Sequence, residues 1–183
     1  MKKLILFAAL LFTATSIVEV QAQTPVTGEA QLTLNLKAVQ SIKVTGNVVI
    51  NYETADDYLN GKDSGEQGTT LTVVSAGGFV VRVEADDLTG GGNTPIEASS
   101  IKVTAAEVSN GGNTSYDSEG TLAKVGAGAK IPLISATKGG VDKVYKVTYE
   151  GADANKYMEN FNNAGEGATQ SYTTTVTYTI AAS

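Results

Sequence analysis

The stretch Tyr172-Thr173-Thr174-Thr175-Val176-Thr177-Tyr178-Thr179-Ile180 shows the pattern that decides the fold class. In an extended chain, Tyr172, Thr174, Val176, Tyr178 and Ile180 share one face, and threonines alone occupy the other. A half-buried strand packs one such row on the core and leaves the other row for solvent or a neighbour. The stretch therefore predicts a strand of an antiparallel sheet.

The same alternation recurs along the chain. It predicts further strands at Ala30–Leu36, Phe79–Ala85, Ile101–Ala106 and Val144–Tyr149, and weaker ones at Ser41–Val44, Val48–Tyr52, Thr69–Ser75 and Lys130–Ser135. Glycine-rich turns separate these segments. Only Thr54–Leu59, with Thr54 as N-cap and Asn60-Gly61 as a stop, and Ala152–Phe161 look briefly helical. We therefore expect an all-β fold, a single antiparallel two-sheet β-sandwich of the Ig-like type with eight or nine strands.

The composition excludes several classes of function. The 183 residues include no Cys, His or Trp, and the net charge is −6. Without His or Cys there is no imidazole base, no thiolate nucleophile, no disulfide and no usual zinc site. Negative charge also disfavours binding to the phosphate backbone of nucleic acids. We therefore expect a protein that is not an enzyme, holds no cofactor and binds no nucleic acid.

The first 22 residues predict a secretory signal peptide, with cleavage between Ala22 and Gln23. Lys2 and Lys3 precede the apolar run Leu4–Phe12, and the segment ends in Val20-Gln21-Ala22. A membrane anchor would need about 20 apolar residues, and polar residues interrupt this run. Residues 23–183 are long enough for one β-sandwich domain with no further transmembrane segment. We expect an exported protein, placed in the periplasm, at the cell surface or outside the cell.

Acidic residues in predicted loops make calcium a candidate ligand. Calcium prefers six to eight oxygen ligands, often supplied by neighbouring loops. The candidate ligands are Asp86, Asp87, Asp117, Glu119 and Asp153. None of their loops has the glycine and glutamate spacing of the twelve-residue calcium loop. The alternative is that these are solvated turn residues of an acidic protein.

Tyrosines in predicted loops make a surface glycan the second candidate ligand. The chain has eight tyrosines, and the most loop-like are Tyr52, Tyr58, Tyr116 and Tyr157. The other four lie at inward positions of predicted strands, where packing in the core is the simpler interpretation. A structural role for the whole set remains the alternative to a platform for sugar rings.

Three stretches together resemble a known class of protein: Gly78–Thr89, Asn93–Val103 and Gln170–Ile180. Their order of strand, loop and closing Thr-rich strand is similar to that of small secreted β-sandwich proteins of Gram-negative bacteria, related in pattern to WxL-type cell-wall domains and fimbrial-type subunits. The chain lacks the Trp-x-Leu motif and the cysteine pair common in usher-assembled pilins. The resemblance implies a fold and a location, and no functional residue.

Two functions from different classes remain open. The first is an exported, non-enzymatic structural or adhesive protein of the cell surface or exterior, which binds itself or another surface protein by strand addition at an open sheet edge. The terminal Thr-rich stretch supports it, because it lacks the charges and prolines that protect edge strands. The alternative is a secreted module that binds calcium or a glycan.

Overall fold

The computed structural model describes residues 26–92, 94–108, 114–115, 119–126, 132–161, 165 and 167–183. The chain divides into two units, Met1–Asn35 and Leu36–Ser183. In the first unit, residues 26–35 have neither helix nor strand, and Leu32 and Leu34 are 93% and 77% exposed. The prediction of a strand over Ala30–Leu36 is therefore wrong for this structure, since alternation is present but no described strand pairs with it.

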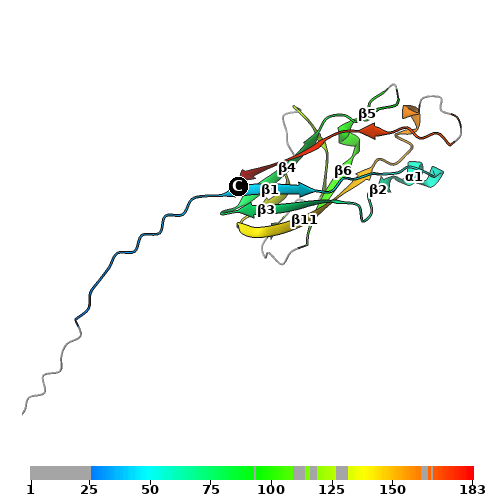
Figure 1. Cartoon of the computed structure of the whole chain (residues 1–183). Helices are drawn as coiled ribbons and strands as arrows, with labels where there is room; N and C mark the ends of the chain where they lie inside the picture. Colours follow the sequence, from blue (N-terminus) through cyan, green and yellow to red (C-terminus); the bar gives the residue numbers. More distant parts are fainter. Residues whose placement is uncertain are drawn as a thin grey trace, which may run out of the picture. The chain divides into compact units, whose positions relative to one another are not determined.

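The second unit is mostly β-strand, and its larger sheet is antiparallel (Figure 1). The order of its strands is β1 (Gln40–Thr45), β3 (Thr69–Ser75), β11 (Gly140–Gly151), β6 (Lys102–Glu107) and β8 (Glu119–Thr121), and β2 (Lys62–Asp63) also pairs with β11. The long strand β11 therefore has neighbours along both sides.

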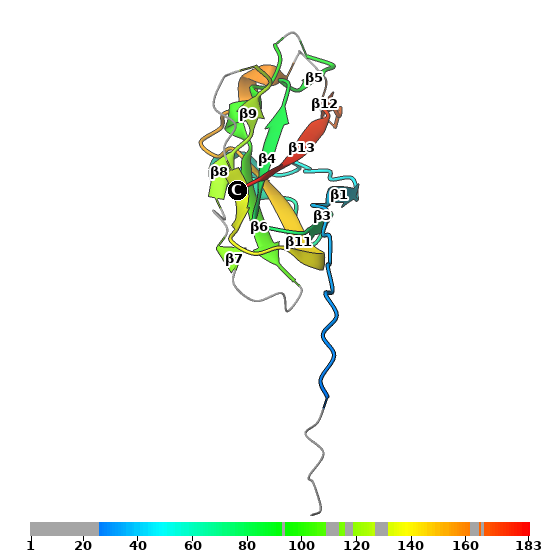
Figure 2. The same ribbon diagram turned by 90° about the vertical axis from the view of Figure 1, so that its left-hand side faces the viewer.

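The smaller sheet contains the end of the chain. Its order is β13 (Val176–Ala182), β4 (Phe79–Ala85), β10 (Pro132–Ala136) and β7 (Thr114–Ser115), with β9 (Ala123–Lys124) paired to β4 in the parallel direction. A separate pair joins β5 (Thr89–Gly90) and β12 (Tyr172–Thr173). The short helical segments are α1 (Ala55–Asn60), η1 (Ala98–Ser100) and η2 (Met158–Asn160). β13 lies beside β4 at the margin of this sheet (Figure 2).

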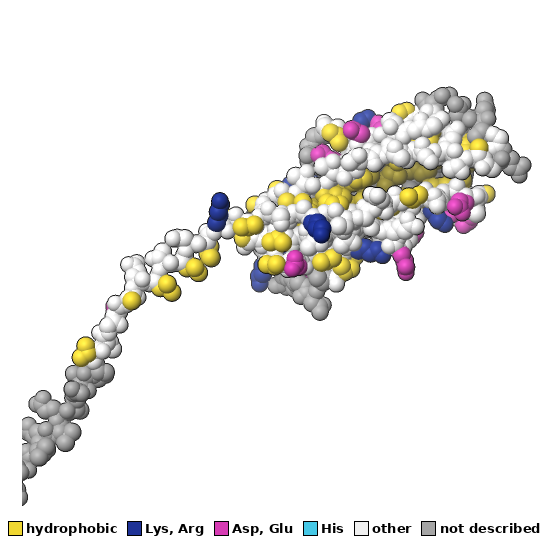
Figure 3. Space-filling view, viewed as in Figure 1, with side chains coloured by type: hydrophobic (Ala, Val, Ile, Leu, Met, Phe, Trp, Pro, Cys, Tyr) yellow, Lys and Arg dark blue, Asp and Glu magenta, His cyan; other side chains and the backbone are white. Residues whose placement is uncertain are grey.

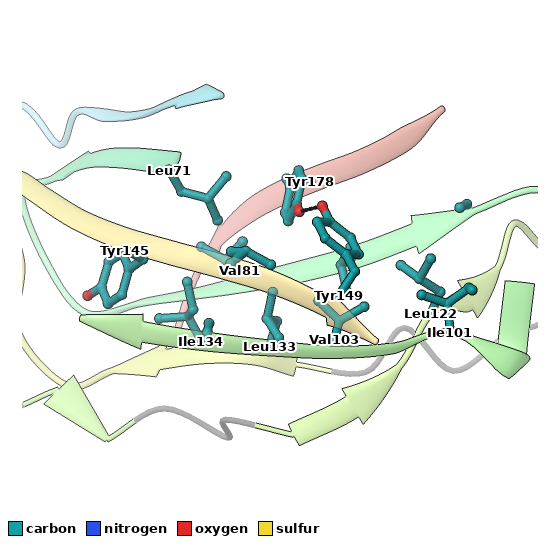
Figure 4. Packing of buried hydrophobic residues seen from close by; sticks show 14 of the residues in the cluster. Leu71, Val81, Ile101, Val103, Leu122, Leu133, Ile134, Tyr145, Tyr149 and Tyr178 are labelled. Atoms are coloured by element: carbon teal, nitrogen blue, oxygen red, sulfur yellow. Dashed lines mark hydrogen bonds between the residues drawn. The ribbon is translucent and has the colours of Figure 1, made fainter. Parts of the chain in front are cut away.

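Both sheets contribute to one hydrophobic core. In β3 and β4 every second residue is buried, so that Leu71 and Val73 of the larger sheet and Phe79 and Val81 of the smaller sheet belong to one cluster. Figure 4 shows Leu71, Val81 and other members of this cluster together. Burial of such apolar surface is the main source of stability in a β domain. The period-two alternation is thus the cause of the packing between the sheets.

Most predicted strands are confirmed. Thr69–Ser75 and Phe79–Ala85 form β3 and β4 with the predicted bounds, whereas the stretch from Tyr172 divides into β12 and β13. Val48–Tyr52 is not a strand, so this prediction is wrong. The described residues form thirteen strands, more than the eight or nine expected, because several have only two or three residues. Such short segments carry too little alternation to be recognised in a sequence.

The predicted helix start at Thr54 is confirmed. The Thr54 hydroxyl accepts a hydrogen bond from the Asp57 amide at 3.3 Å, and the Asp57 carboxylate accepts one from the Thr54 amide at 2.9 Å. This reciprocal arrangement is a capping box. Gly61 follows the helix with a φ of 79°, a conformation that glycine adopts without strain.

Within the described part of the chain, no helix combines the length and apolar character needed to cross a membrane.

Candidate functional site

The edge strand β13 is the first component of the candidate site. It pairs with β4 along its whole length, from Val176 opposite Ala85 to Ala182 opposite Phe79. Among the described strands, no other pairs with β13. It contains no charged residue and no proline. Natural edge strands usually carry such residues to prevent pairing with other chains, so β13 has an unprotected edge.

The opposite border of the site is formed by β1 and the residues that follow it. β1 pairs with β3, and no second partner is found among the described strands. After β1, residues 46–53 continue without a described ladder partner, although Val48, Ile50 and Tyr52 are half-buried and Val49 is exposed. In this segment the alternation in the sequence accompanies half-burial of every second side chain. It could not show that the backbone lacks a neighbouring strand.

An apolar furrow lies between these two borders. Figure 3 shows hydrophobic side chains in a recess between the two layers, on the face that carries β1 and β13. The half-buried apolar residues that the borders contribute to the core are Ile42, Val48 and Ile50 on one side and Val176 and Ile180 on the other. β1 and β13 come close to each other next to the turn between β3 and β4. At this turn Gln40 of β1 pairs with Ser75, the last residue of β3, and Ala182 of β13 pairs with Phe79, the first residue of β4. We refer to this recess as the furrow.

A buried chain of hydroxyl groups connects the two sheets beside β13. The hydroxyl of Tyr178, which is only 9% exposed, is hydrogen-bonded to that of Tyr149 in β11 (Figure 4). The Tyr149 hydroxyl also lies 3.2 Å from the Thr69 hydroxyl. Burial, with the nearby Tyr149, raises the pKa of Tyr178 well above its usual range. The Tyr178 hydroxyl therefore stays neutral, and its hydrogen bond to Tyr149 links β13 to the larger sheet.

Three of the four loop tyrosines proposed for glycan binding come together. The ring centroid of Tyr52 is 5.1 Å from that of Tyr58 and 5.3 Å from that of Tyr157. Tyr116 lies outside the described residues. The ring planes meet at 54° and 82°, so the rings pack edge against face rather than forming a flat platform.

The hydroxyl groups of this tyrosine cluster are bound to the protein itself. The Tyr52 hydroxyl donates to the carbonyl of Ala152 at 2.8 Å, and the Tyr157 hydroxyl accepts from the Ala152 amide at 3.0 Å. The Tyr157 hydroxyl also lies 2.9 Å from that of Ser100. Burial raises the pKa of Tyr52 above its usual range, and the adjacent Tyr157 adds to this effect. This geometry favours a structural junction of distant segments over a sugar platform.

The structure describes the side chains of three acidic residues proposed for calcium, Asp86, Asp87 and Asp153. Asp87 accepts hydrogen bonds from Lys124 Nζ at 2.5 Å and from the Ala98 amide at 3.0 Å, and the lysine lowers the pKa of this carboxylate. Asp86 and Asp153 are exposed. The described residues include no group of three or more acidic side chains that could hold a metal ion. The carboxylate of Asp87 is thus engaged by a cation of the protein.

Two further candidates for calcium cannot be placed as ligands. Asp117 lies outside the described residues, and for Glu119 the structure describes the backbone, at the start of β8.

The ion pair of Asp57 is a feature that strand alternation and composition do not predict. Its carboxylate accepts hydrogen bonds from Lys62 Nζ at 2.9 Å and from the amides of Glu53 and Thr54. These donors, Lys62 first, hold the pKa of Asp57 far below its usual range. The spacing Thr54-x-x-Asp57 was the available signal, because an acid at this position completes a capping box. The group fixes α1 to β2, and its partners leave it no role toward a ligand.

No protein-family model matches the chain, and no curated protein matches it significantly. The functional inference therefore depends on the geometry of the two open edges and the furrow between them.

Proposed function

We propose that this protein is an exported, non-enzymatic structural protein of the cell surface or exterior, which associates with other copies by strand addition at β13. In this proposal the two sheets form an Ig-like β-sandwich whose open edge is the binding site. The observation that carries it is the unprotected edge of β13 beside the apolar furrow. The predicted signal peptide supports the location outside the cytoplasm.

Strand addition fits the chemistry of this edge. An added strand gains main-chain hydrogen bonds along the edge, and every second side chain can enter a neighbouring apolar recess. β13 offers seven residues without charge, and its inward row of Val176, Tyr178 and Ile180 borders the furrow. A partner strand with three apolar residues at alternate positions would therefore extend both the sheet and the core.

The alternatives receive less support from the geometry. Lys124 engages the best-placed acid, Asp87, and backbone groups bind the hydroxyls of Tyr52 and Tyr157. A catalytic site would need converging titratable groups with shifted pKa values in a recess. The furrow is bordered by Val, Ile and Thr side chains, which suit packing with a partner strand rather than acid–base chemistry.

The test is a pair of lysine substitutions on adjacent residues of β13. Val176→Lys puts a charge on the furrow side, where an added strand would cover it, so we expect self-association to weaken at least about tenfold. Thr177→Lys puts the same charge on the exposed face of the strand and is expected to change association much less. Light scattering coupled to size-exclusion chromatography, over a range of protein concentrations, measures the effect.

Folding of both variants is checked by circular dichroism before association is compared. A wild-type protein that remains monomeric at all concentrations would overturn the proposal. Equal association of wild type and Val176→Lys would show that copies bind through another surface.

A further inference from the structure

We infer that the strand added to β13 is the segment Ala30–Leu36 of a second copy of this chain. The inference rests on the proposed function, because it assigns the partner of the same edge. In this arrangement Leu32, Leu34 and Leu36 of one copy enter the furrow of the next. Their backbone extends the smaller sheet beyond β13.

The segment itself carries an exposed apolar row. Leu32, Leu34 and Leu36 are 93%, 77% and 86% exposed. They alternate with Gln31, Thr33 and Asn35, the pattern of a strand with one buried face. Three leucines on one face of a segment are costly to leave in water, since each side chain favours burial. The segment thus has the sequence of a strand but lacks a described neighbour.

The segment matches β13 in length and in the spacing of its apolar residues. Both have seven residues, roughly 23 Å of extended chain at about 3.3 Å per residue. Both have three large apolar residues at alternate positions, and neither contains a charge. The residues between them are Gln31, Thr33 and Asn35 in the segment and Thr177, Thr179 and Ala181 in β13. Placed side by side, their threonines and amides would share the solvent face, where cross-strand polar pairs are favourable.

The connection between the segment and β1 is short. The Val39 carbonyl accepts a hydrogen bond from the Ala76 amide at 2.9 Å, so the ladder of β1 already includes Val39. Only Lys37 and Ala38 would remain for a reversal of the chain. Two-residue hairpin turns need positive φ angles, which favour Gly, Asn or Asp rather than Lys and Ala. The connection therefore disfavours a hairpin with β1 and favours pairing with another copy.

The test uses two substitutions in the segment of the exported protein. Leu34→Glu puts a charge on the face that would enter the furrow, so we expect association to weaken at least about tenfold. Thr33→Glu puts the same charge on the opposite face and should have a small effect. Because Leu34 is exposed, Leu34→Glu should leave the melting temperature at low concentration unchanged. Association of Leu34→Glu at the wild-type level, or an equal loss in both variants, would overturn the inference.

Disulfide trapping locates the contact, because the native chain has no cysteine. A Thr33→Cys copy is mixed with copies that carry cysteine at Thr177 or Thr179, on the exposed face of β13. A copy with Thr45→Cys, at the exposed edge of β1, is the matched control. We expect mixed dimers with at least one β13 position in preference to Thr45. Preferential trapping at Thr45 would overturn the assignment to β13.

The two proposals fail in different ways. If Val176→Lys weakens association and Leu34→Glu does not, strand addition at β13 stands and another segment is the partner. If the wild-type protein never associates, both proposals fail.

Discussion

The strands β11 and β13 have similar sequences and different surroundings. Both alternate tyrosine and β-branched residues on their inward faces. β11 lies between β3 and β6, and its residues Tyr145 and Val147 are completely buried. β13 has β4 alone as a described neighbour, and its residues Val176 and Ile180 are half-buried. The number of neighbouring strands, rather than the hydrophobicity of the strand, sets the burial of its side chains.

Because of this difference, we expect β11 to contribute mainly to the stability of the fold and the furrow side of β13 mainly to association between copies. Residues of β11 make their contacts within the chain, so their substitution should affect folding. Residues of β13 on the furrow leave part of their surface available, so their substitution should affect folding less and binding of a partner strand more.

The largest effect is expected from Tyr145→Ala in β11. The Tyr145 ring is fully buried and meets that of Phe79 at a centroid distance of 6.5 Å. Its removal leaves a cavity between the sheets, and we expect a loss of about 3–5 kcal/mol in the free energy of unfolding. Urea denaturation of the monomeric protein measures this value. A loss below about 1.5 kcal/mol would mean that β11 is not central to the core.

The next test makes the same substitution in both strands. Val147→Ala in β11 should cost about 2–3 kcal/mol, because the removed methyl groups are completely buried. Val176→Ala in β13 should cost less than about 1 kcal/mol, because the side chain is half-buried. Comparable losses in the two urea titrations would contradict the distinction between the strands.

A smaller effect is expected from Tyr178→Phe, which removes the hydroxyl that joins β13 to β11. Tyr149 keeps the Thr69 hydroxyl as a partner, so no hydroxyl becomes isolated. We expect a loss of about 1 kcal/mol in the free energy of unfolding. Compared with wild type, the Tyr178→Phe variant should exchange its backbone amide hydrogens faster in β13, with a smaller change in β11. An unchanged exchange rate in β13 would show that the hydroxyl pair does not hold this strand.

The smallest effect concerns Asp57, which fixes the α1–β2 segment next to the end of β11. Its pKa in the folded protein lies below the value of about 3.9 for an unfolded chain. The folded state therefore binds fewer protons, and the stabilisation is present above about pH 4 and lost as the pH falls through the folded pKa. The melting temperature of the Asp57→Asn variant should therefore fall less than that of wild type as the pH is lowered.

Melting curves between about pH 2 and pH 7 test this expectation against the control Glu66→Gln, which changes an exposed carboxylate. An identical acid dependence in wild type and Asp57→Asn would show that the Asp57–Lys62 pair contributes nothing to stability.

The strands of the core were predictable because alternation reports which side chains face inward. Thr69–Ser75 and Phe79–Ala85 have the predicted bounds, and Thr54 caps α1 as predicted. Alternation is also present in Val48–Tyr52, where Val48, Ile50 and Tyr52 are half-buried although the segment is not a strand. It could not predict the lack of a ladder partner there or along Ala30–Leu36, because pairing depends on residues distant in the sequence.

The candidate site was less predictable for the same reason. The terminal stretch signalled an unprotected strand, but only the sheet order places β13 at an edge beside the furrow. The contact of Tyr52, Tyr58 and Tyr157 joins segments about 100 residues apart, which no local pattern encodes. The lysine that engages Asp87 likewise lies 37 residues away.

The pairing of β13 with β4 also has a consequence for folding during synthesis. The paired residues lie about 91 to 103 positions apart in the chain. A ribosome or translocation channel therefore delivers β4 long before β13, and contacts of such high sequence separation form slowly. During this interval the outer edge of β4 is bare, and a neighbouring chain can occupy it. We expect newly made protein to be most prone to misassembly at β4, and a holding chaperone to be most useful there.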